Sequence, residues 1–129
     1  MFKKKILLID DEVDFGRIVK MNLELLDDSY DVSLARNGKE GVKKAISLRP
    51  HLIILDILMP HMNGFEVIKR LKENDKTSII PVVMLTAKAD EESKIMAAQL
   101  FNEDYVTKPI EAPELKEKID AVLKRTQNI

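Results

Sequence analysis

The sequence has no cysteine, no excess of basic residues and no long apolar run. The missing cysteine excludes disulfide bonds, thiolate zinc sites and cysteine nucleophiles. Lysine and arginine together number 21 against 22 aspartates and glutamates, so the formal net charge is −1. A chain this close to neutral lacks the broad basic surface that holds nucleic acids through their phosphates, and we expect no direct nucleic-acid binding.

The apolar runs are too short to place any segment in a membrane. A membrane-spanning helix needs about 18 consecutive apolar residues, and no stretch of the sequence approaches that length. The apolar run near the amino terminus, residues 6–9, is shorter than the core of about 7–15 residues in a signal peptide. We therefore expect a cytoplasmic protein without a membrane partner.

The chain is long enough for one domain with a real core. Its 129 residues are 45% hydrophobic and 33% charged, as in soluble globular domains. No repeat, low-complexity tract or linker interrupts the sequence. We expect a single domain over residues 1–129, with its core in about residues 3–126 and no effector domain in this chain.

Three short, continuous apolar runs stand out, at residues 6–9, 52–55 and 82–85. Runs of this length are typical of strands buried on both faces, as in a parallel sheet that is covered by helices. Two weaker candidates are residues 31–35, where polar and apolar residues alternate, and residues 105–107. We expect these two strands at the edges of the sheet, where burial is only partial.

Helical spacing of apolar residues occupies the intervals between the strands. It is found in residues 13–26, 42–46 and 65–71, in a segment that starts at Asp90, and in a segment that starts at Pro113. Asp90 suits a helix N-cap, because the two acidic residues after it would lie in a first turn that favours negative charge. Pro113 suits a first helical position, and an apolar stripe from Leu115 to Leu123 follows it.

Five strands alternating with five helices predict an α/β fold with a doubly wound parallel sheet. Crossovers of this length are right-handed, and the two edge candidates fit the strand order 2-1-3-4-5. In such a sheet the ligand site lies outside the carboxyl ends of the strands, where the strand order reverses. Here that position falls between the first and third strands.

Polar residues follow the strands at that edge of the predicted sheet. Asp10 and Asp11 follow the first strand, Asp56 the third, Thr86 the fourth and Lys108 the fifth. Carboxylates that converge repel one another unless a cation joins them, and Mg²⁺ suits carboxylate oxygens combined with phosphate. A carboxylate can also act as a nucleophile toward phosphorus, in a reaction that needs positive charge and hydrogen bonds around the phosphoryl oxygens. Lys108 and Thr86 are candidates to supply these.

Each of these residues also has an ordinary structural interpretation. Asp10 or Asp11 alone is equally well explained as a helix N-cap, and Asp56 as a turn acid. Thr86 alone can simply end a strand, and a single lysine such as Lys108 is usually solvated. The structural interpretation must hold at four strand ends at once, and we therefore favour the functional one.

Four motifs together resemble the receiver domains of two-component response regulators. They are residues 6–12 (ILLIDDE), 56–64 (DILMPHMNG), 83–87 (VMLTA) and 104–109 (DYVTKP). The motifs occur in order and at the expected spacing along almost the whole chain. The resemblance implies a flavodoxin-like receiver fold and a phosphorylation-activated regulator in a two-component phosphorelay.

Carried over position by position, the resemblance assigns Asp56 as the phosphoacceptor. It also implies a bound Mg²⁺, or Mn²⁺ in its place, as cofactor. The metal ligands would be the carboxylates of Asp10, Asp11 and Asp56 and the backbone carbonyl of Leu58. In the same scheme Gly64 and Pro60 shape the loop that follows the third strand.

The resemblance further implies how the phosphoryl group is recognised. Lys108 would pair with the phosphoryl oxygens, and Thr86 would donate a hydrogen bond to them. Tyr105 would be the switch aromatic that turns inward when Thr86 is drawn to the phosphate. The Lys108–Pro109 peptide bond would be cis, as is usual in the family.

Two features bear on how the switch behaves. Phe101 and Asn102 stand where the family usually has Gly-Ala, and this removes an easy left-handed helix cap, although asparagine can adopt that conformation. Leu58 and Lys88 lie two residues beyond the acceptor and the threonine, at positions that tune the lifetime of the phosphoryl group in the family. The apolar Leu58 offers no side-chain help to an attacking water, which predicts slow autodephosphorylation.

The implied phosphoryl donor is a phosphohistidine on a sensor histidine kinase or a histidine phosphotransfer protein, or a small molecule such as acetyl phosphate. The domain would catalyse its own gain and loss of phosphate, so we expect a self-modifying substrate rather than a turnover enzyme. The output would pass through the fourth helix, fifth strand and fifth helix to a protein target that the sequence does not name. A phosphorylation-dependent dimer is compatible with this scheme.

Three alternatives to a receiver each predict a different sequence pattern. A receiver-like interaction module that is not regulated by phosphorylation would be expected to have lost some of the site residues. Another α/β phosphotransferase or hydrolase would need a glycine-rich phosphate loop, or a second acid two residues after Asp56, and the sequence has neither. A nucleotide-binding flavodoxin-like protein would need a phosphate-cradling loop after the first strand, where Asp10 and Asp11 repel phosphate unless a metal intervenes.

Overall fold

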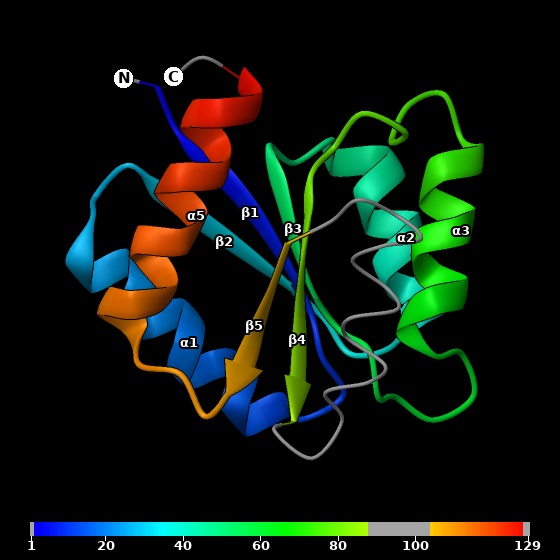
Figure 1. Cartoon of the computed structure of the whole chain (residues 1–129), viewed down its shortest axis with the longest axis horizontal. Coiled ribbons are helices and arrows are strands. Elements are labelled where there is room, and N and C mark those ends of the chain that lie inside the picture. The colour runs from blue at the N-terminus through cyan, green and yellow to red at the C-terminus, as the bar shows by residue number, and fades with distance from the viewer. Residues whose placement is uncertain (1, 88–103, 128–129) are drawn as a thin grey trace.

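The computed structural model describes residues 2–87 and 104–127, in which one sheet lies between two layers of helices (Figure 1). The strands are β1 (Lys4–Ile9), β2 (Tyr30–Ala35), β3 (Leu52–Asp56), β4 (Val82–Ala87) and β5 (Asp104–Lys108). The helices are α1 (Val13–Leu26), α2 (Gly38–Leu48), α3 (Gly64–Glu73) and α5 (Ala112–Gln127). The helix predicted from Asp90 lies outside the described residues, as do Lys88, Phe101 and Asn102.

The sheet confirms the predicted α/β topology. All strands are parallel, and their order is β2-β1-β3-β4-β5. The two weaker strand candidates are indeed the edge strands, and each exposes a residue to water, Asp31 in β2 and Tyr105 in β5. Every residue of β3, by contrast, is buried, because this strand lies in the middle of the sheet.

Helix α5 begins one residue earlier than the sequence predicted. Its first residue is Ala112, so Pro113 is the second helical residue rather than the first. The amide hydrogens of the first turn have no partner within a helix, so a proline at either position costs no hydrogen bond.

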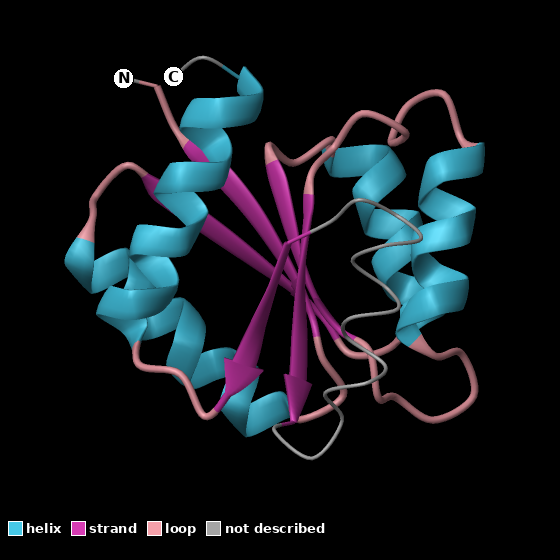
Figure 2. Ribbon diagram, viewed as in Figure 1, coloured by secondary structure: helices cyan, strands magenta, loops and turns pink. Residues whose placement is uncertain are grey.

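The core has two halves, one on each face of the sheet. Helices α1 and α5 cover one face, and α2 and α3 cover the other (Figures 1 and 2). Along β1, Leu7 and Ile9 pack with the residues of α2 and α3, whereas Ile6 and Leu8 pack with those of α1 and α5. Burial on both faces explains why the central strands have uninterrupted apolar sequences.

The strand register brings the polar strand ends to one edge of the sheet. Ile9 pairs with Leu55, so Asp10 and Asp56 both follow directly from paired positions. Ala87 at the end of β4 pairs with Lys108 at the end of β5. The candidate residues therefore lie at the carboxyl edge of the sheet, toward which the arrowheads of β4 and β5 point in Figure 1.

Among the described residues, no helix is long and apolar enough to cross a membrane.

Candidate functional site

Three aspartates converge at the carboxyl ends of β1 and β3, as the sequence predicted. Asp10, Asp11 and Asp56 each contribute a carboxylate oxygen, and these oxygens all lie within 4.8 Å of one another. Asp10 and Asp56 are 4% and 5% exposed, whereas Asp11 is open to solvent. The cluster therefore combines two buried acids with one acid that is open to solvent.

Backbone amides orient the two buried carboxylates. The Leu58 N–H donates to Asp56 Oδ1 at 3.0 Å, and the Glu12 N–H donates to Asp10 Oδ1 at 2.9 Å. Asp10 Oδ2 is buried and accepts no hydrogen bond from the described residues. The cation nearest to this oxygen among the described residues is the Lys108 ammonium, 3.0 Å away. Together the three carboxylates supply oxygen ligands of the kind that a hard divalent ion such as Mg²⁺ prefers.

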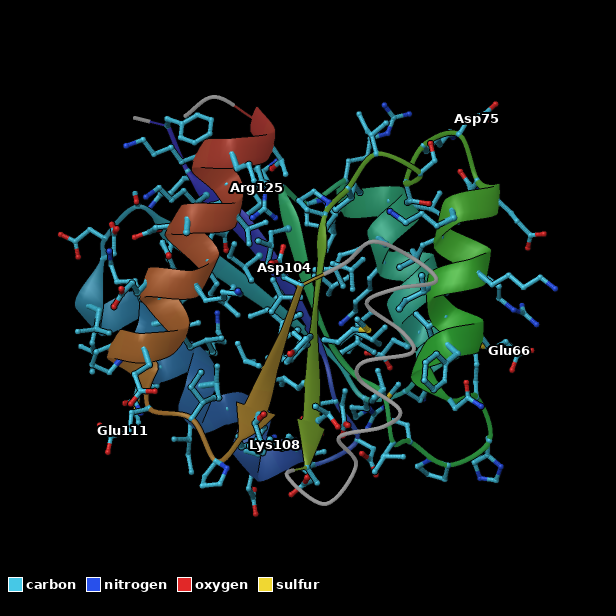
Figure 3. All side chains as sticks on the ribbon, in the orientation of Figure 1. Glu66, Asp75, Asp104, Lys108, Glu111 and Arg125 are labelled. Atoms are coloured by element: carbon cyan, nitrogen blue, oxygen red, sulfur yellow. The ribbon has the colours of Figure 1, made fainter. Side chains whose placement is uncertain are left out.

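Lys108 reaches this carboxylate cluster from the end of β5, where Figure 3 labels it. Its ammonium nitrogen lies 3.0 Å from Asp10 Oδ2, although not aligned for a hydrogen bond, and 3.4 Å from Asp56 Oδ2. It also donates to Glu12 Oε1 at 2.9 Å. On its other side the nitrogen lies 4.5 Å from the centre of the Phe15 ring. One cation therefore contacts three acids.

The surroundings of the site raise the pKa of both Asp56 and Lys108. Burial raises the pKa of Asp56 from 3.8 to about 6, helped by the charge of Asp10 and opposed by the Leu58 hydrogen bond and the Lys108 charge. Burial lowers the pKa of Lys108, but the short contacts with Glu12 and Asp10 and the charge of Asp56 outweigh it, and the net shift is upward. A divalent cation among the carboxylates would lower the pKa of Asp56 and make the nucleophilic form available.

The loop after β3 is held in one conformation by a close approach and a tight turn. A Cβ on Gly64 would lie 2.4 Å from the Ile57 Cα, so only glycine fits there. The Met62 N–H donates to the Pro60 carbonyl at 2.8 Å, and the residue between them, His61, has φ of 71°. This is a γ-turn, a rare conformation that the surrounding structure must enforce. The turn fixes the segment that carries the acceptor and Leu58.

Thr86 and Tyr105 lie on the neighbouring strands β4 and β5. Thr86 is fully buried in β4, and its hydroxyl donates to the Ala87 carbonyl at 3.3 Å. Tyr105 in β5 is 38% exposed. The Lys108–Pro109 peptide bond is cis, as the resemblance implied. The Leu58 side chain is 55% exposed. Slow autodephosphorylation stays a prediction.

Two contacts of Lys108 were not predicted from the sequence. Glu12 belongs to the recognised motif around Asp10 and Asp11, but nothing in the local pattern pairs it with a lysine 96 positions away. Phe15 occupies a half-buried position of α1 that the helical pattern did not single out. Both contacts depend on the strand order, so only a three-dimensional arrangement could have identified them.

Comparison with known proteins identifies the family to which this fold and site belong. Residues 6–120 match the family model described as the response regulator receiver domain. The chain therefore belongs to the family of response regulator receiver domains, as the motifs predicted. This membership favours phosphorylation-regulated signalling over the interaction module and over the other α/β enzymes.

Relatives from several bacteria share this stretch of sequence. The chain is 39% identical over 124 residues to the alkaline phosphatase synthesis transcriptional regulatory protein PhoP of Bacillus subtilis, covering 96% of the chain and 50% of that protein. It is 36% identical over 126 residues to the phosphate regulon transcriptional regulatory protein PhoB of Pseudomonas aeruginosa, covering 98% of the chain and 54% of that protein. The chain thus spans about half the length of these curated relatives.

Solved structures share the fold over nearly the whole chain. The chemotaxis response regulator CheY4 of Vibrio cholerae superposes with a TM-score of 0.82 at 29% identity, covering 93% of this chain and 98% of that chain. A response regulator receiver domain protein of Clostridium thermocellum gives a TM-score of 0.85 at 28% identity, covering 95% of this chain and 96% of that chain.

Proposed function

We propose that this chain accepts a phosphoryl group on a carboxylate oxygen of Asp56 in a Mg²⁺-dependent reaction. The observation that carries the proposal is the position of Asp56, which lies 3.4 Å from the Lys108 ammonium and within metal-bridging reach of Asp10 and Asp11. A nucleophilic carboxylate, a fixed cation and a cluster of metal-ligating oxygens are the groups that phosphoryl transfer to an acid requires.

Asp10, Asp11, Asp56 and the Leu58 carbonyl would hold the metal. When bound, Mg²⁺ supplies positive charge that neutralises the acceptor cluster and the phosphoryl oxygens. The chain's own residues do the rest. The Leu58 amide fixes one oxygen of Asp56, and the Lys108 ammonium lies 3.4 Å from the other.

The covalent step forms a bond between an Asp56 oxygen and phosphorus. With a phosphohistidine donor the phosphorus–nitrogen bond breaks at the same time, and the departing imidazole takes up a proton from water. Lys108 then pairs with the phosphoryl oxygens, and the Thr86 hydroxyl leaves the Ala87 carbonyl to donate to them. In hydrolysis, water attacks the phosphorus, the bond between phosphorus and the Asp56 oxygen breaks, and inorganic phosphate and the free carboxylate result.

Phosphorylation converts to a signal through a change of surface. The phosphoryl group carries about −1.5 to −2 units of charge, and charge-assisted hydrogen bonds contribute about 1.5–3 kcal/mol each. Two or three such bonds reach the roughly 5.5 kcal/mol that moves a two-state equilibrium from 1:99 to 99:1. Tyr105 would turn inward as Thr86 moves, and β5 and α5 would present the altered surface.

The partners follow from this chemistry. The donor in the cell is a sensor histidine kinase or a histidine phosphotransfer protein, and we place the exchange in the cytoplasm. The reader of the altered surface is a protein target or, in a phosphorylation-dependent dimer, a second copy of the chain.

The first experiment is intact mass spectrometry after incubation with acetyl phosphate and Mg²⁺. We expect a gain of one phosphoryl mass that disappears in Asp56→Asn and when the metal is chelated. Asp75→Asn is the matched control, because this acid lies at the opposite end of the molecule from Lys108 (Figure 3). Retention of the gain in Asp56→Asn would contradict the proposal, as would failure of acetyl phosphate and of a panel of histidine kinases alike.

A further inference from the structure

Of the three acids that contact Lys108, Glu12 differs from the other two in its exposure. The Asp10 and Asp56 side chains are 1% and 7% exposed, whereas the Glu12 side chain is 62% exposed. Glu12 nevertheless makes the shortest of the three contacts, at 2.9 Å. The ammonium is thus bound by two acids of the site and by one acid at its solvent-facing rim.

The Glu12 side chain does not cap the helix at whose amino end it lies. Glu12 is the N-cap residue of α1, where a side chain commonly accepts a hydrogen bond from the first turn of the helix. Here the side chain makes no such capping bond and is directed to Lys108 instead. Its backbone is fixed at both ends, because its N–H donates to Asp10 and its carbonyl accepts from the Gly16 N–H at 3.0 Å.

We propose that Glu12 is a positioning residue that holds the Lys108 ammonium in the unphosphorylated protein and releases it when the phosphoryl group arrives on Asp56. The inference rests on the proposed function. Three carboxylate oxygens lie within 3.4 Å of the Lys108 nitrogen, so a phosphoryl oxygen that approaches it competes with at least one of them. Glu12 is the contact that costs least to release, because water can rehydrate its exposed carboxylate, whereas Asp10 and Asp56 are buried.

The cost of breaking the Glu12–Lys108 contact therefore opposes phosphorylation slightly. A variant without this carboxylate does not have that cost and should be phosphorylated faster. Asp10 and Asp56 still hold the ammonium over the site in the absence of Glu12. An exposed ion pair of ordinary strength corresponds to a change of about two- to fivefold in rate. We expect Glu12→Gln to gain a phosphoryl group from acetyl phosphate faster by about this factor.

A shorter acid separates positioning from simple charge repulsion. Glu12→Asp keeps the negative charge, but with a fixed backbone it is one methylene too short to reach Lys108. Asp14→Asn is the matched control, because it removes an exposed acid two positions away that forms no ion pair within the described part of the chain. Positioning predicts that Glu12→Asp resembles Glu12→Gln, whereas charge repulsion predicts that it resembles the wild type.

The direct test measures Lys108 itself in metal-free, unphosphorylated protein. The protein is treated with a limiting amount of acetic anhydride, and acetylation of each lysine is quantified by peptide mass spectrometry, with Lys124 on α5 as the internal reference. We expect Lys108 to react faster in Glu12→Gln and in Glu12→Asp, by about two- to fivefold, and at the wild-type rate in Asp14→Asn.

Initial rates of phosphoryl gain from acetyl phosphate complete the test on the same four proteins. Faster gain in both Glu12 variants, with unchanged gain in Asp14→Asn, supports the inference. Unchanged acetylation of Lys108 in the Glu12 variants would overturn it, and so would a faster rate in Glu12→Gln alone. These outcomes are independent of Asp56→Asn, whose failure to abolish phosphorylation would instead overturn the proposed function.

Discussion

At the scale of single residues, the site keeps an acid in a place that disfavours its charge. Asp56 is almost fully buried beside Asp10, and burial raises its pKa from 3.8 to about 6. For a group with a raised pKa in the folded protein, the stability that it contributes is complete below pH 3.8 and is lost as the pH rises through about 6. At neutral pH the ionised acceptor therefore destabilises the metal-free fold.

We predict that Asp56→Asn stabilises the metal-free protein at pH 7. The expected increase in the free energy of unfolding is about 1–2 kcal/mol, discounted for solvent screening at the open rim of the site. The difference should shrink toward zero near pH 4, where the wild-type carboxyl is protonated. Urea unfolding in the presence of a chelator, at several pH values, measures it. A destabilised asparagine variant, or a difference independent of pH, would show that burial does not dominate at this residue.

The residue scale also shows where sequence reasoning ends. Asp10, Asp56 and Lys108 could be predicted because each lies at the carboxyl end of a predicted strand, and parallel strands bring these ends to one edge of the sheet. Glu12 and Phe15 could not, because their contacts with Lys108 depend on how α1 leaves β1 and how β5 ends. A local pattern carries no information on that relation.

At the scale of elements, helix α5 is fastened to the sheet by polar contacts at the end opposite the site. The Tyr30 hydroxyl donates to Asp120 Oδ1 at 2.5 Å, and the ammonium groups of Lys4 and Lys116 lie 3.3 and 2.6 Å from the same carboxylate. Burial raises the pKa of Asp120, but the bonds from Lys116 and Tyr30 and the charge of Lys4 outweigh it and the net shift is downward. This carboxylate links β1, β2 and α5.

Asp120→Asn should therefore loosen α5 from the sheet. A lowered pKa means that the stabilisation is present above the ordinary value of 3.8 and is lost as the pH falls through the lower value of the folded protein. We expect a loss of about 1 kcal/mol at pH 7 and a smaller loss at pH 3. Chemical unfolding at the two pH values checks this, with the exposed neighbour Asp28→Asn as control. Equal losses at both pH values would mean that the carboxylate charge is not responsible.

The outer edge of β2 is closed by side chains from the helices on both faces of the sheet. Val32 donates its N–H to Glu24 at 2.9 Å and accepts from Lys20 at 2.6 Å. The Leu34 carbonyl accepts from Lys44 of α2 at 2.6 Å. These bonds occupy backbone groups of an edge strand that would otherwise be open to pairing with another chain.

We predict that Glu24→Ala exposes the Val32 amide to water. A hydrogen bond to a charged group contributes about 1.5–3 kcal/mol, so hydrogen exchange at Val32 should accelerate about tenfold or more. Amide exchange followed by NMR measures this, with the amide of Leu8 in the central β1 as an internal control. Unchanged exchange at Val32, or an equal acceleration at Leu8, would contradict a local role for Glu24.

The central strands could be predicted because they are buried on both faces. The first residue of α5 was predicted less accurately. The runs in β1, β3 and β4 are apolar because each strand has a helical layer on both sides, and this pattern is visible in sequence. The start of α5 differed by one residue, because a proline is accepted at either of the first helical positions. The pairing of Tyr30 with Asp120 joins residues 90 positions apart and has no local signature.

At the scale of the whole molecule, the candidate site and the polar contacts that hold α5 against the sheet lie in different parts of the fold. The acceptor cluster lies at the carboxyl edge of the sheet with Lys108, and the Arg125–Asp104 ion pair lies away from Lys108 (Figure 3). Arg125 near the end of α5 pairs with Asp104 at the start of β5, so the two elements that flank Lys108 are joined at their far ends. A change at Asp56 can thus move the Lys108 end of β5 while the opposite end stays anchored.

The measurement that decides whether this molecule is a phosphoryl switch is the chemical location of the phosphoryl group. The protein is incubated with Mg²⁺ and either acetyl phosphate or a phosphorylated histidine kinase, and borohydride then reduces any acyl phosphate to the alcohol. Peptide mass spectrometry should find homoserine at position 56 only in the samples with both donor and Mg²⁺. Homoserine at another aspartate, or at none with either kind of donor, would contradict the assignment of Asp56 as the acceptor.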